Sequence, residues 1–379
     1  MIKVGITGQA GFIGSHLYQT LNLHKESFEC VPFLDEYFDD DTKLISFAKQ
    51  CDAIVHLAAM NRHEDPNVIY ETNIALVKKL ISACEASQSK PHILFSSSTQ
   101  EERENQYGKS KKEGRILLEQ WATKNKANFS AFVIPNVFGS FGRPYYNSVV
   151  ATFCHQLTHN ETPKIEIDAE IKLIYIEHLV NHFIERITEI HKLNQSGNKV
   201  ETINIAHTTE AKVSTILSVL QQYKKQYLDQ GEIPSLENPF HRELFCTFMT
   251  YIDYPTFFPF LLKKNTDERG CFVELIKLNS GGQISFSTTK PGITRGNHYH
   301  TRKSERFAVI KGKARIEIRR IGTDKVYSFE LDGNSPSFVD MPIWYTHNIT
   351  NIGDEELYTI FWINEHFNAN NPDTFFEKV

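Results

Sequence analysis

The hydrophobic pattern of the chain changes its period once, and this change constrains the fold more than any other feature. Up to about residue 230, short β-branched runs alternate with longer segments in which apolar residues recur every three or four positions. Such alternation is typical of βαβ units, which build a parallel sheet with helices on both faces. The expected strands are 3–7, 53–57, 92–96 and 130–134, and the expected helices include 73–86 and 109–122.

The last third of the chain contains only short strand-like runs separated by turn residues, which predicts an all-β sandwich or barrel. Between the two patterns, a segment rich in Pro and Phe favours a packed connector over a flexible linker. The predicted domains are therefore 1–230, a connector at 231–265, and 266–379. The expected strands of the last region are 272–277, 283–288, 305–310, 314–320, 325–331, 337–340 and 357–362.

Composition and charge narrow the class of function. The 41 basic and 46 acidic side chains give a net charge of −5 without a dense basic stripe, so nucleic-acid binding is not expected. No apolar run approaches the ~18 residues that would span a bilayer, so membrane insertion is not expected either. Met1 leads into a strand-like run and the six cysteines show no CxxC spacing, which favours a cytoplasmic protein with reduced thiols. A small-molecule enzyme is the expected class.

Gly8, Gly11 and Gly14 follow the first expected strand and open an expected helix at 12–21. Glycine removes the Cβ atoms that would collide with a pyrophosphate, and the helix amino terminus attracts its charge, so the context favours dinucleotide binding. Asp35 follows Gly14 by 21 positions (35 − 14 = 21) and would bind the ribose of NAD if the second strand ends there, although Pro32 disturbs that register. The acidic run 39–41 is interpreted as solvated surface.

Tyr107 and Lys111 stand four positions apart at the start of an expected helix, after a Ser-rich run at 96–99. This spacing places both on one helix face, where the ammonium could lower the pKa of the phenol. A nearby hydroxyl could then hold a carbonyl oxygen while the phenol exchanges a proton with it. Each pattern alone also fits a solvated helix face, but the combination with the glycines indicates a reductase-type site.

On these motifs, residues 1 to about 230 resemble the extended short-chain dehydrogenases/reductases that act on nucleotide sugars. The family's loop matches Thr7 to Gly14, its HLAA run matches 56–59, and its FSSS, YGKSK and PNVFG runs match 95–98, 107–111 and 135–139. Only eight residues separate Ser98 from Tyr107, fewer than half of the family's usual number, which predicts a more open substrate cleft. The resemblance implies catalysis by Ser98 (with Ser97 or Thr99 as alternatives), Tyr107 and Lys111, a sugar nucleotide facing Asn136, and cofactor contacts from Gly8, Gly11, Phe12, Ile13, Gly14, Leu57, Ala58, Tyr107 and Lys111.

A second candidate site lies in the β-rich region. His298 and His300 are two positions apart, so both imidazoles face one side of an extended strand. Glu305 and His347 add a carboxylate and a third nitrogen, a set that suits zinc or another divalent first-row metal. Incidental histidines on a polar strand are the alternative in a chain with 16 of them, but the spacing makes that alternative weak.

These stretches resemble the cupin motifs, with Trp344 in place of a usual glycine. Residues 267–274 (DERGCFVE) resemble the opening signature of keto-sugar 3,5-epimerases, which implies that Arg269, Phe272 and Glu274 line a nucleotide-sugar pocket. A turn followed by an ordinary edge strand is the alternative for this segment.

Over essentially the whole chain, the sequence resembles the bifunctional capsular polysaccharide enzymes of the CapF/WbjC family, on the runs 146–157, 290–300, 345–349 and 364–376. The resemblance implies an α/β Rossmann-type doubly wound parallel sheet followed by an all-β cupin barrel, in a homodimer. It implies a UDP-linked 4-keto-6-deoxy amino sugar as substrate. The cupin would invert carbon 3, and the reductase domain would then reduce the 4-ketone with NADPH to UDP-2-acetamido-2,6-dideoxy-L-talose. NADP is the implied cofactor, with NAD as an alternative.

Chemistry requires the same order, because a C–H bond is acidic beside a ketone and not beside an alcohol. Four protein ligands fit a structural metal as well as a catalytic one. Tyr299, Tyr345 and His366 are candidates for the base. The main alternative is a monofunctional 4-ketoreductase whose cupin is a zinc-stabilised dimerisation module, and a non-catalytic sugar-nucleotide sensor is a third hypothesis.

Overall fold

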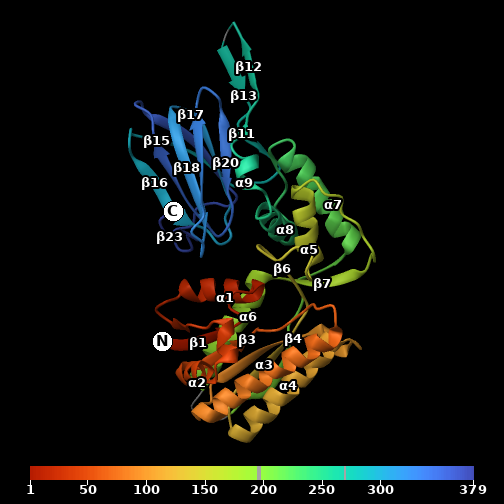
Figure 1. Cartoon of the computed structure of the whole chain (residues 1–379). Helices are drawn as coiled ribbons and strands as arrows, with labels where there is room; N and C mark the ends of the chain where they lie inside the picture. Colours follow the sequence, from red (N-terminus) through yellow and green to blue (C-terminus); the bar gives the residue numbers. More distant parts are fainter. Residues whose placement is uncertain (194–197, 269) are drawn as a thin grey trace. The chain divides into compact units, whose positions relative to one another are not determined.

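The computed structural model describes residues 1–193, 198–268 and 270–379. The chain forms two compact units (Figure 1): Met1–Phe138, Gly142–Ser148 and Ala169–Ala211 make the first, and Gly139–Phe141, Val149–Asp168 and Lys212–Val379 make the second. These units are divided differently from the domains expected at residues 230 and 265, which remain a prediction. Within the described ranges, no helix combines the length and the apolar character that crossing a bilayer requires.

A six-stranded parallel sheet forms the centre of the first unit, in the order β2-β1-β3-β4-β5-β8. Its strands are mostly buried, as expected for a sheet covered on both faces. The strand order reverses between β1 and β3, and ligands of open α/β sheets bind beyond the carboxyl ends of strands at such a point. The strands are β1 (Ile2–Thr7), β2 (Phe28–Val31), β3 (Ala53–His56), β4 (His92–Ser98), β5 (Phe129–Ile134) and β8 (Val200–Asn204).

Helices cover both faces of this sheet, which confirms the doubly wound class. In Figure 1, α3 and α4 lie side by side on one face, and α1 packs with α6 on the other. Helix α4 begins at Gln106 because the Asn105 side chain accepts the Gly108 N–H at 2.7 Å. The helices are α1 (Phe12–Asn22), η1 (Asp35–Asp39), α2 (Asp41–Gln50), α3 (Pro66–Ser87), η2 (Thr99–Glu102), α4 (Gln106–Asn125) and α6 (Ile176–Leu193). A small sheet contains β6 (Asn136–Phe138), β7 (Glu170–Tyr175) and β9 (Thr209–Lys212).

Two five-stranded sheets with antiparallel pairing form the β-rich part of the second unit, as expected for a cupin barrel. Phe307 and Val309 of one sheet and Ile316 and Ile318 of the other are buried core residues. The first sheet has the order β11-β20-β17-β22-β15 and the second β19-β18-β21-β16-β23. Their strands are β11 (Phe260–Leu261), β15 (Gln283–Thr289), β16 (Thr294–Tyr299), β17 (Glu305–Lys311), β18 (Lys313–Arg320), β19 (Val326–Asp332), β20 (Ser337–Met341), β21 (Tyr345–Asn351), β22 (Leu357–Ile363) and β23 (Phe375–Phe376).

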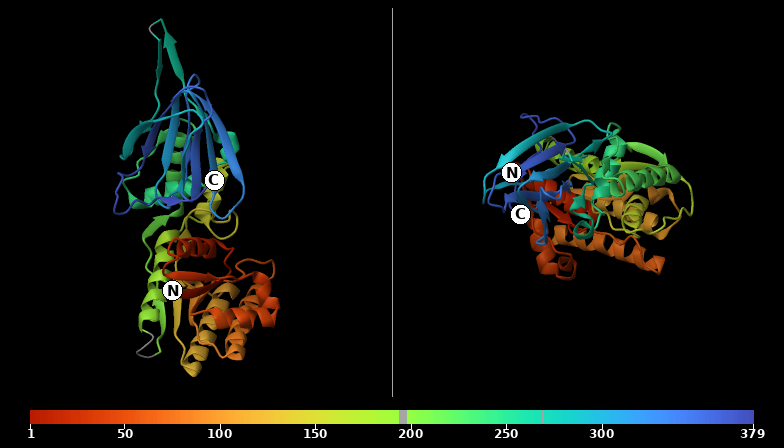
Figure 2. Two further views of the ribbon diagram at one scale, coloured as in Figure 1. Left: turned by 90° about the vertical axis from the view of Figure 1, so that its left-hand side faces the viewer. Right: turned by 90° about the horizontal axis from the view of Figure 1, so that it is seen from above.

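The strand expected at 272–277 is two short strands with different partners. β13 (Gly270–Val273) pairs with β12 (Lys264–Asp267) in a hairpin that projects beyond the two large sheets (Figures 1 and 2). β14 (Lys277–Leu278) pairs instead with β10 (Glu232–Ile233). The unit also contains the helices α5 (Val149–Thr158), α7 (Val213–Tyr223), η3 (Lys224–Leu228), α8 (Pro239–Met249) and α9 (Tyr254–Phe257).

A buried ion pair fixes η3 to the β-rich part. Arg306 of β17 and Asp340 of β20 are both buried, and two hydrogen bonds of 2.8 Å join the guanidinium to the two carboxylate oxygens. The Tyr227 phenol of η3 donates to the same carboxylate, and Arg306 Nη1 donates to Gly231 O at 2.6 Å. The guanidinium also lies 3.5 Å from the centre of the Phe338 ring. These contacts explain why the helices around η3 belong to the same compact unit as the barrel.

Replacing Arg306 is therefore expected to destabilise the second unit strongly. Arg306→Met leaves Asp340 buried without its cation, which typically costs about 3–5 kcal/mol of unfolding free energy. Urea unfolding followed by tryptophan fluorescence measures this loss. Arg315→Met is the control, because its pair with Glu330 (3.5 Å) is exposed and such pairs contribute about 0–1 kcal/mol. Equal losses in the two variants would contradict the expectation.

Candidate functional site

The loop between β1 and α1 brings the predicted dinucleotide-binding residues together. Gly8 has φ +71°, and a Cβ there would lie 2.9 Å from Ala58 N, while a Cβ on Gly14 would lie 2.3 Å from Gly8 O. Glycine is therefore required where the loop passes the end of β3. Thr7 accepts the N–H groups of Leu57 (3.2 Å, at its carbonyl) and Ala58 (3.3 Å, at its hydroxyl).

A phosphate site needs donors of positive character as well as a loop without Cβ atoms, and the amino terminus of α1 supplies these donors. Its N-cap residue is Gly11, which has no side chain that could accept a helix N–H. The first N–H groups of the helix, with their partial positive charge, can therefore serve an anion. The residues predicted to contact the cofactor in this loop, Gly8, Gly11, Phe12, Ile13, Gly14, Leu57 and Ala58, meet at the switch point of the sheet.

Asp35 does not lie at the end of the second strand. β2 ends at Val31, because the following Pro32 has no N–H for the ladder, and Asp35 is an exposed residue that begins η1. The condition under which Asp35 would select NAD is therefore not met. The choice between NAD and NADP stays a prediction.

The Ser-rich end of β4 separates the three candidate hydroxyls. Ser97 donates to a carboxylate oxygen of Glu101, and Thr99 is exposed at the start of η2. Ser98 Oγ accepts the Gln100 N–H at 3.2 Å. Within the described residues, the Ser98 hydroxyl has no acceptor for its own hydrogen, which leaves it able to donate to a carbonyl oxygen. This placement favours Ser98 over its two alternatives.

Tyr107 and Lys111 lie on one face of α4, with Lys111 Nζ 5.7 Å from the centre of the Tyr107 ring. The ammonium is buried and donates to Ser96 O at 2.9 Å. Burial lowers the pKa of Lys111 to about 8. The expected lowering of the Tyr107 pKa is wrong: burial, and secondarily the Tyr146 phenol, raise it to about 12. Tyr107 is therefore a protonated phenol, the form that can give a proton to a ketone oxygen.

The sequence analysis missed the group that holds η2 beside α4. Arg115 binds both oxygens of Glu101, with Nε–Oε1 at 3.0 Å and Nη2–Oε2 at 2.8 Å. Both side chains are mostly buried. Glu101 thus stabilises the short turn between Ser98 and Tyr107. An acid in this turn and an Arg 14 positions later form no recognisable motif, so no sequence signal could have found the pair.

The predicted substrate-binding residues are spread over several elements. Asn136 is exposed on β6, where its Nδ2 donates to Lys172 O at 3.1 Å. Phe272 is 66% exposed on the projecting hairpin, and the exposed Glu274 pairs with Lys277 at 2.9 Å. Arg269 lies outside the described residues. The role of Arg269, Phe272 and Glu274 in a nucleotide-sugar pocket stays a prediction.

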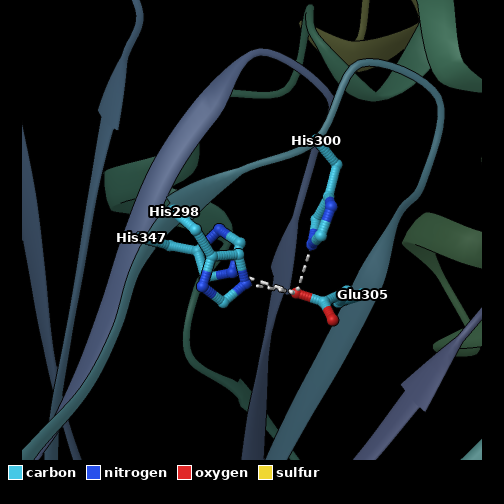
Figure 3. Close-up of side chains that lie close together, drawn as sticks. All are labelled: His298, His300, Glu305 and His347. Carbon is cyan, nitrogen blue, oxygen red and sulfur yellow. Dashed lines mark ion pairs between the residues drawn. The ribbon is translucent and has the colours of Figure 1, made fainter. Parts of the chain in front are cut away.

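The structure brings His298, His300, Glu305 and His347 together as one cluster, hereafter the His/Glu cluster (Figure 3). One ligand atom from each residue lies within 4.8 Å of the others. A β-bulge at Gly296 brings His298 opposite His347 of β21, while Glu305 begins β17. Sequence spacing therefore identified the whole set.

The donor atoms of the His/Glu cluster fit a divalent metal. Glu305 Oε2 lies 2.9 Å from His347 Nε2 and 3.2 Å from His300 Nε2. Yet these three buried atoms have no hydrogen-bond partner among the described residues, so their lone pairs converge on one point. Burial lowers the pKa of His347, which favours the neutral form that binds metals. Burial opposes ionisation of Glu305, but the three imidazoles hold its pKa well below the usual value.

The candidate bases lie in different settings. Tyr299 follows His298 directly on β16, so it faces the other side of the strand, where it stacks on Trp344. Tyr345 is buried against Tyr254, with ring centres 5.5 Å apart. Burial raises the pKa of both phenols, that of Tyr345 to about 12. His366 is exposed in the C-terminal tail. Tyr345 touches the His/Glu cluster through its main chain, because its carbonyl oxygen accepts the Nδ1–H of His347 at 3.2 Å.

Both the N-terminal and the C-terminal region of the chain match known protein families. Residues 4–206 match the NAD dependent epimerase/dehydratase family, and residues 265–375 match the polysaccharide biosynthesis C-terminal domain. Over 377 residues the chain is 33% identical to a Pseudomonas aeruginosa protein named UDP-2-acetamido-2,6-beta-L-arabino-hexul-4-ose reductase, covering 99% of this chain and 98% of that relative.

Solved structures include similar chains. The crystal structure of the capsular polysaccharide assembling protein CapF from Staphylococcus aureus is similar over 100% of both chains, with 32% identity and a TM-score of 0.61. The structure of RMD from Pseudomonas aeruginosa, complexed with NADPH, matches 59% of this chain and 83% of its own at 18% identity and a TM-score of 0.51, and shows the fold alone. The chain therefore belongs to the CapF family, with an epimerase/dehydratase-type region followed by a polysaccharide biosynthesis C-terminal domain.

Proposed function

We propose that this protein is an NADPH-dependent nucleotide-sugar reductase with a 3-epimerase activity. Its substrate would be UDP-2-acetamido-2,6-dideoxy-hexos-4-ulose and its product UDP-2-acetamido-2,6-dideoxy-L-talose, for L-N-acetylfucosamine of a capsule or O-antigen. The observation that carries the proposal is the 33% identity, along 99% of the chain, to a relative named as a reductase of such a UDP-linked 4-ulose. A cytoplasmic location, expected from the sequence, stays a prediction.

The reductase chemistry is assigned to the end of β4 and the start of α4. The glycine loop and α1 would hold the dinucleotide, which supplies the hydride when bound. Ser98 would donate a hydrogen bond to the oxygen on carbon 4, and Tyr107 would give that oxygen a proton. Lys111 would place its positive charge beneath the phenol and close to the cofactor ribose. Asn136 is proposed to face the sugar nucleotide.

Tyr107→Phe tests the proton donor directly. Loss of a positioned general acid typically slows a reaction about 10²–10⁴-fold, so kcat for NADPH oxidation with the 4-keto sugar should fall by that factor. Cofactor affinity, measured by NADPH fluorescence, should change little. Tyr18→Phe is the control because it removes a half-buried phenol elsewhere in the same unit. Full activity in Tyr107→Phe would contradict the role of Tyr107 as the proton donor, whereas a wild-type protein that binds the sugar nucleotide but oxidises no NADPH would favour the sugar-nucleotide sensor.

The pH profile tests the role of Lys111. Burial lowers its pKa to about 8, so the ammonium is present below that pH and lost above it. Tyr107, with a pKa near 12, stays protonated throughout. The rate of ketone reduction is therefore expected to be level from pH 6 to about 8 and to decline toward pH 10. A profile that stays level to pH 10, in steady-state assays at saturating NADPH, would contradict this role.

We propose that the β-rich region inverts carbon 3 before the reduction, because only the ketone makes that hydrogen acidic. His298, His300, Glu305 and His347 would hold the metal, which when bound stabilises negative charge on an oxygen. His298 is the most exposed member of the His/Glu cluster, with 25% of its side chain accessible. This side of the cluster is the proposed approach for the sugar. Arg269, Phe272 and Glu274 stay predictions as nucleotide contacts.

Two observations favour a second candidate, a reductase whose barrel serves only for metal-stabilised dimerisation. Four protein donors around one point are typical of closed, structural metal sites. Ile284 and Phe286 on the edge strand β15 are 58% and 72% exposed, as residues of a subunit interface would be in a separated chain. The homodimer is a proposal under both candidates, and light scattering of the purified chain measures it.

Deuterium exchange separates the two candidates. In D2O without NADPH, the proposed epimerase should incorporate deuterium at carbon 3 of the 4-keto sugar, which mass spectrometry and NMR detect. No exchange would leave the reductase with a dimerisation module. Exchange that survives chelation in a folded, metal-free protein would assign the metal a structural role. His347→Ala, which removes a buried donor, should behave like the chelated protein.

A further inference from the structure

The C-terminal tail returns to β16, the strand that carries His298 and that ends just before His300. β23 pairs with β16 so that Phe376 lies opposite His298 and Phe375 opposite Tyr299. Asp373, two positions before β23, is 4% exposed and lies against the loop that follows His300. A segment more than 70 positions away in sequence thus lies beside the strand of His298 and the loop that follows His300.

The Asp373 side chain organises that loop through four hydrogen bonds. Its Oδ1 accepts the Thr301 N–H at 3.1 Å and the Thr301 hydroxyl at 2.6 Å. Its Oδ2 accepts the N–H groups of Arg302 at 3.1 Å and Lys303 at 3.2 Å. Three successive backbone donors are therefore satisfied by one carboxylate, which fixes the path of the chain between His300 and Glu305.

The backbone of Asp373 acts on the imidazole itself. His300 Nδ1 donates to Asp373 O, and this acceptor keeps the proton on Nδ1. The lone pair of Nε2 is then available on the side where Glu305 Oε2 lies, 3.2 Å away. Asp373 has φ +42°, a left-handed conformation that lets its carbonyl and its carboxylate reach the same loop.

We infer that Asp373 is a positioning residue for the metal: it sets the tautomer and the orientation of His300 and holds the loop that joins two ligands. Partners of this kind typically contribute a factor of about 10–100 in metal affinity. The inference rests on the proposed metal site and on neither proposed reaction. Its test therefore measures metal release and not turnover.

Asp373→Asn is the sharpest variant, because Asn also tolerates positive φ and keeps the backbone carbonyl. The Asn amide has one acceptor oxygen where the carboxylate has two. It therefore cannot accept all four of the hydrogen bonds that Oδ1 and Oδ2 of Asp373 accept. Zinc transfer from the loaded full-length protein to the chelator 4-(2-pyridylazo)resorcinol should be about 10–100-fold faster than in the wild type. Thr301→Val removes one of the four bonds and should give a smaller acceleration. Asp354→Asn, an exposed Asp in a loop of the same unit, should leave the rate unchanged.

Each other outcome overturns the inference in a recognisable way. A wild-type protein that binds no zinc defeats both the proposed metal site and the role of Asp373. Normal zinc release from Asp373→Asn defeats the role of Asp373 and leaves the metal site standing. Thermal melting with and without zinc identifies a purely structural role. If Asp373→Asn lowers Tm as much without zinc as with it, the residue stabilises the fold and does not act on the metal.

Discussion

The buried pair between Arg306 and Asp340 is the constraint on which the second unit depends. Two charges removed from water destabilise a protein unless every polar atom finds a partner. Here both carboxylate oxygens bind the guanidinium, and the remaining bonds come from Tyr227 and the carbonyl of Gly231. Because these groups come from β17, β20, η3 and the start of the connector, the network is satisfied only when all of these elements are in place.

The same strand connects this network to the His/Glu cluster. Successive side chains of a strand point to opposite faces, so Arg306 and its neighbour Glu305 serve different sides of β17. Arg306 faces the helical elements, whereas Glu305 meets the three imidazoles. Anchoring β17 from outside therefore also fixes the carboxylate inside, and the tail residue Asp373 fixes the loop between His300 and Glu305 from the other end.

In the first unit, burial decides which proton chemistry the site can support. Lys111 is enclosed beside Ser96 and keeps its charge less readily than an exposed lysine, while Tyr107 keeps its proton more readily than an exposed tyrosine. A protonated phenol, together with a Ser98 hydroxyl whose hydrogen has no acceptor among the described residues, suits the reduction of a ketone. The short turn between Ser98 and Tyr107 is stabilised by Glu101 and Arg115.

Local sequence patterns determined the expected helices and the expected strands other than 272–277. They also determined the glycine loop, the shared face of Tyr107 and Lys111, and the four members of the His/Glu cluster, because each depends on spacing within an element or motif. Tertiary structure alone decided the rest. Burial reversed the expected pKa shift of Tyr107, and Asp373 reached His300 from 73 positions away. Periodicity reports how a segment folds locally, whereas burial and hydrogen-bond partners depend on which distant segments meet.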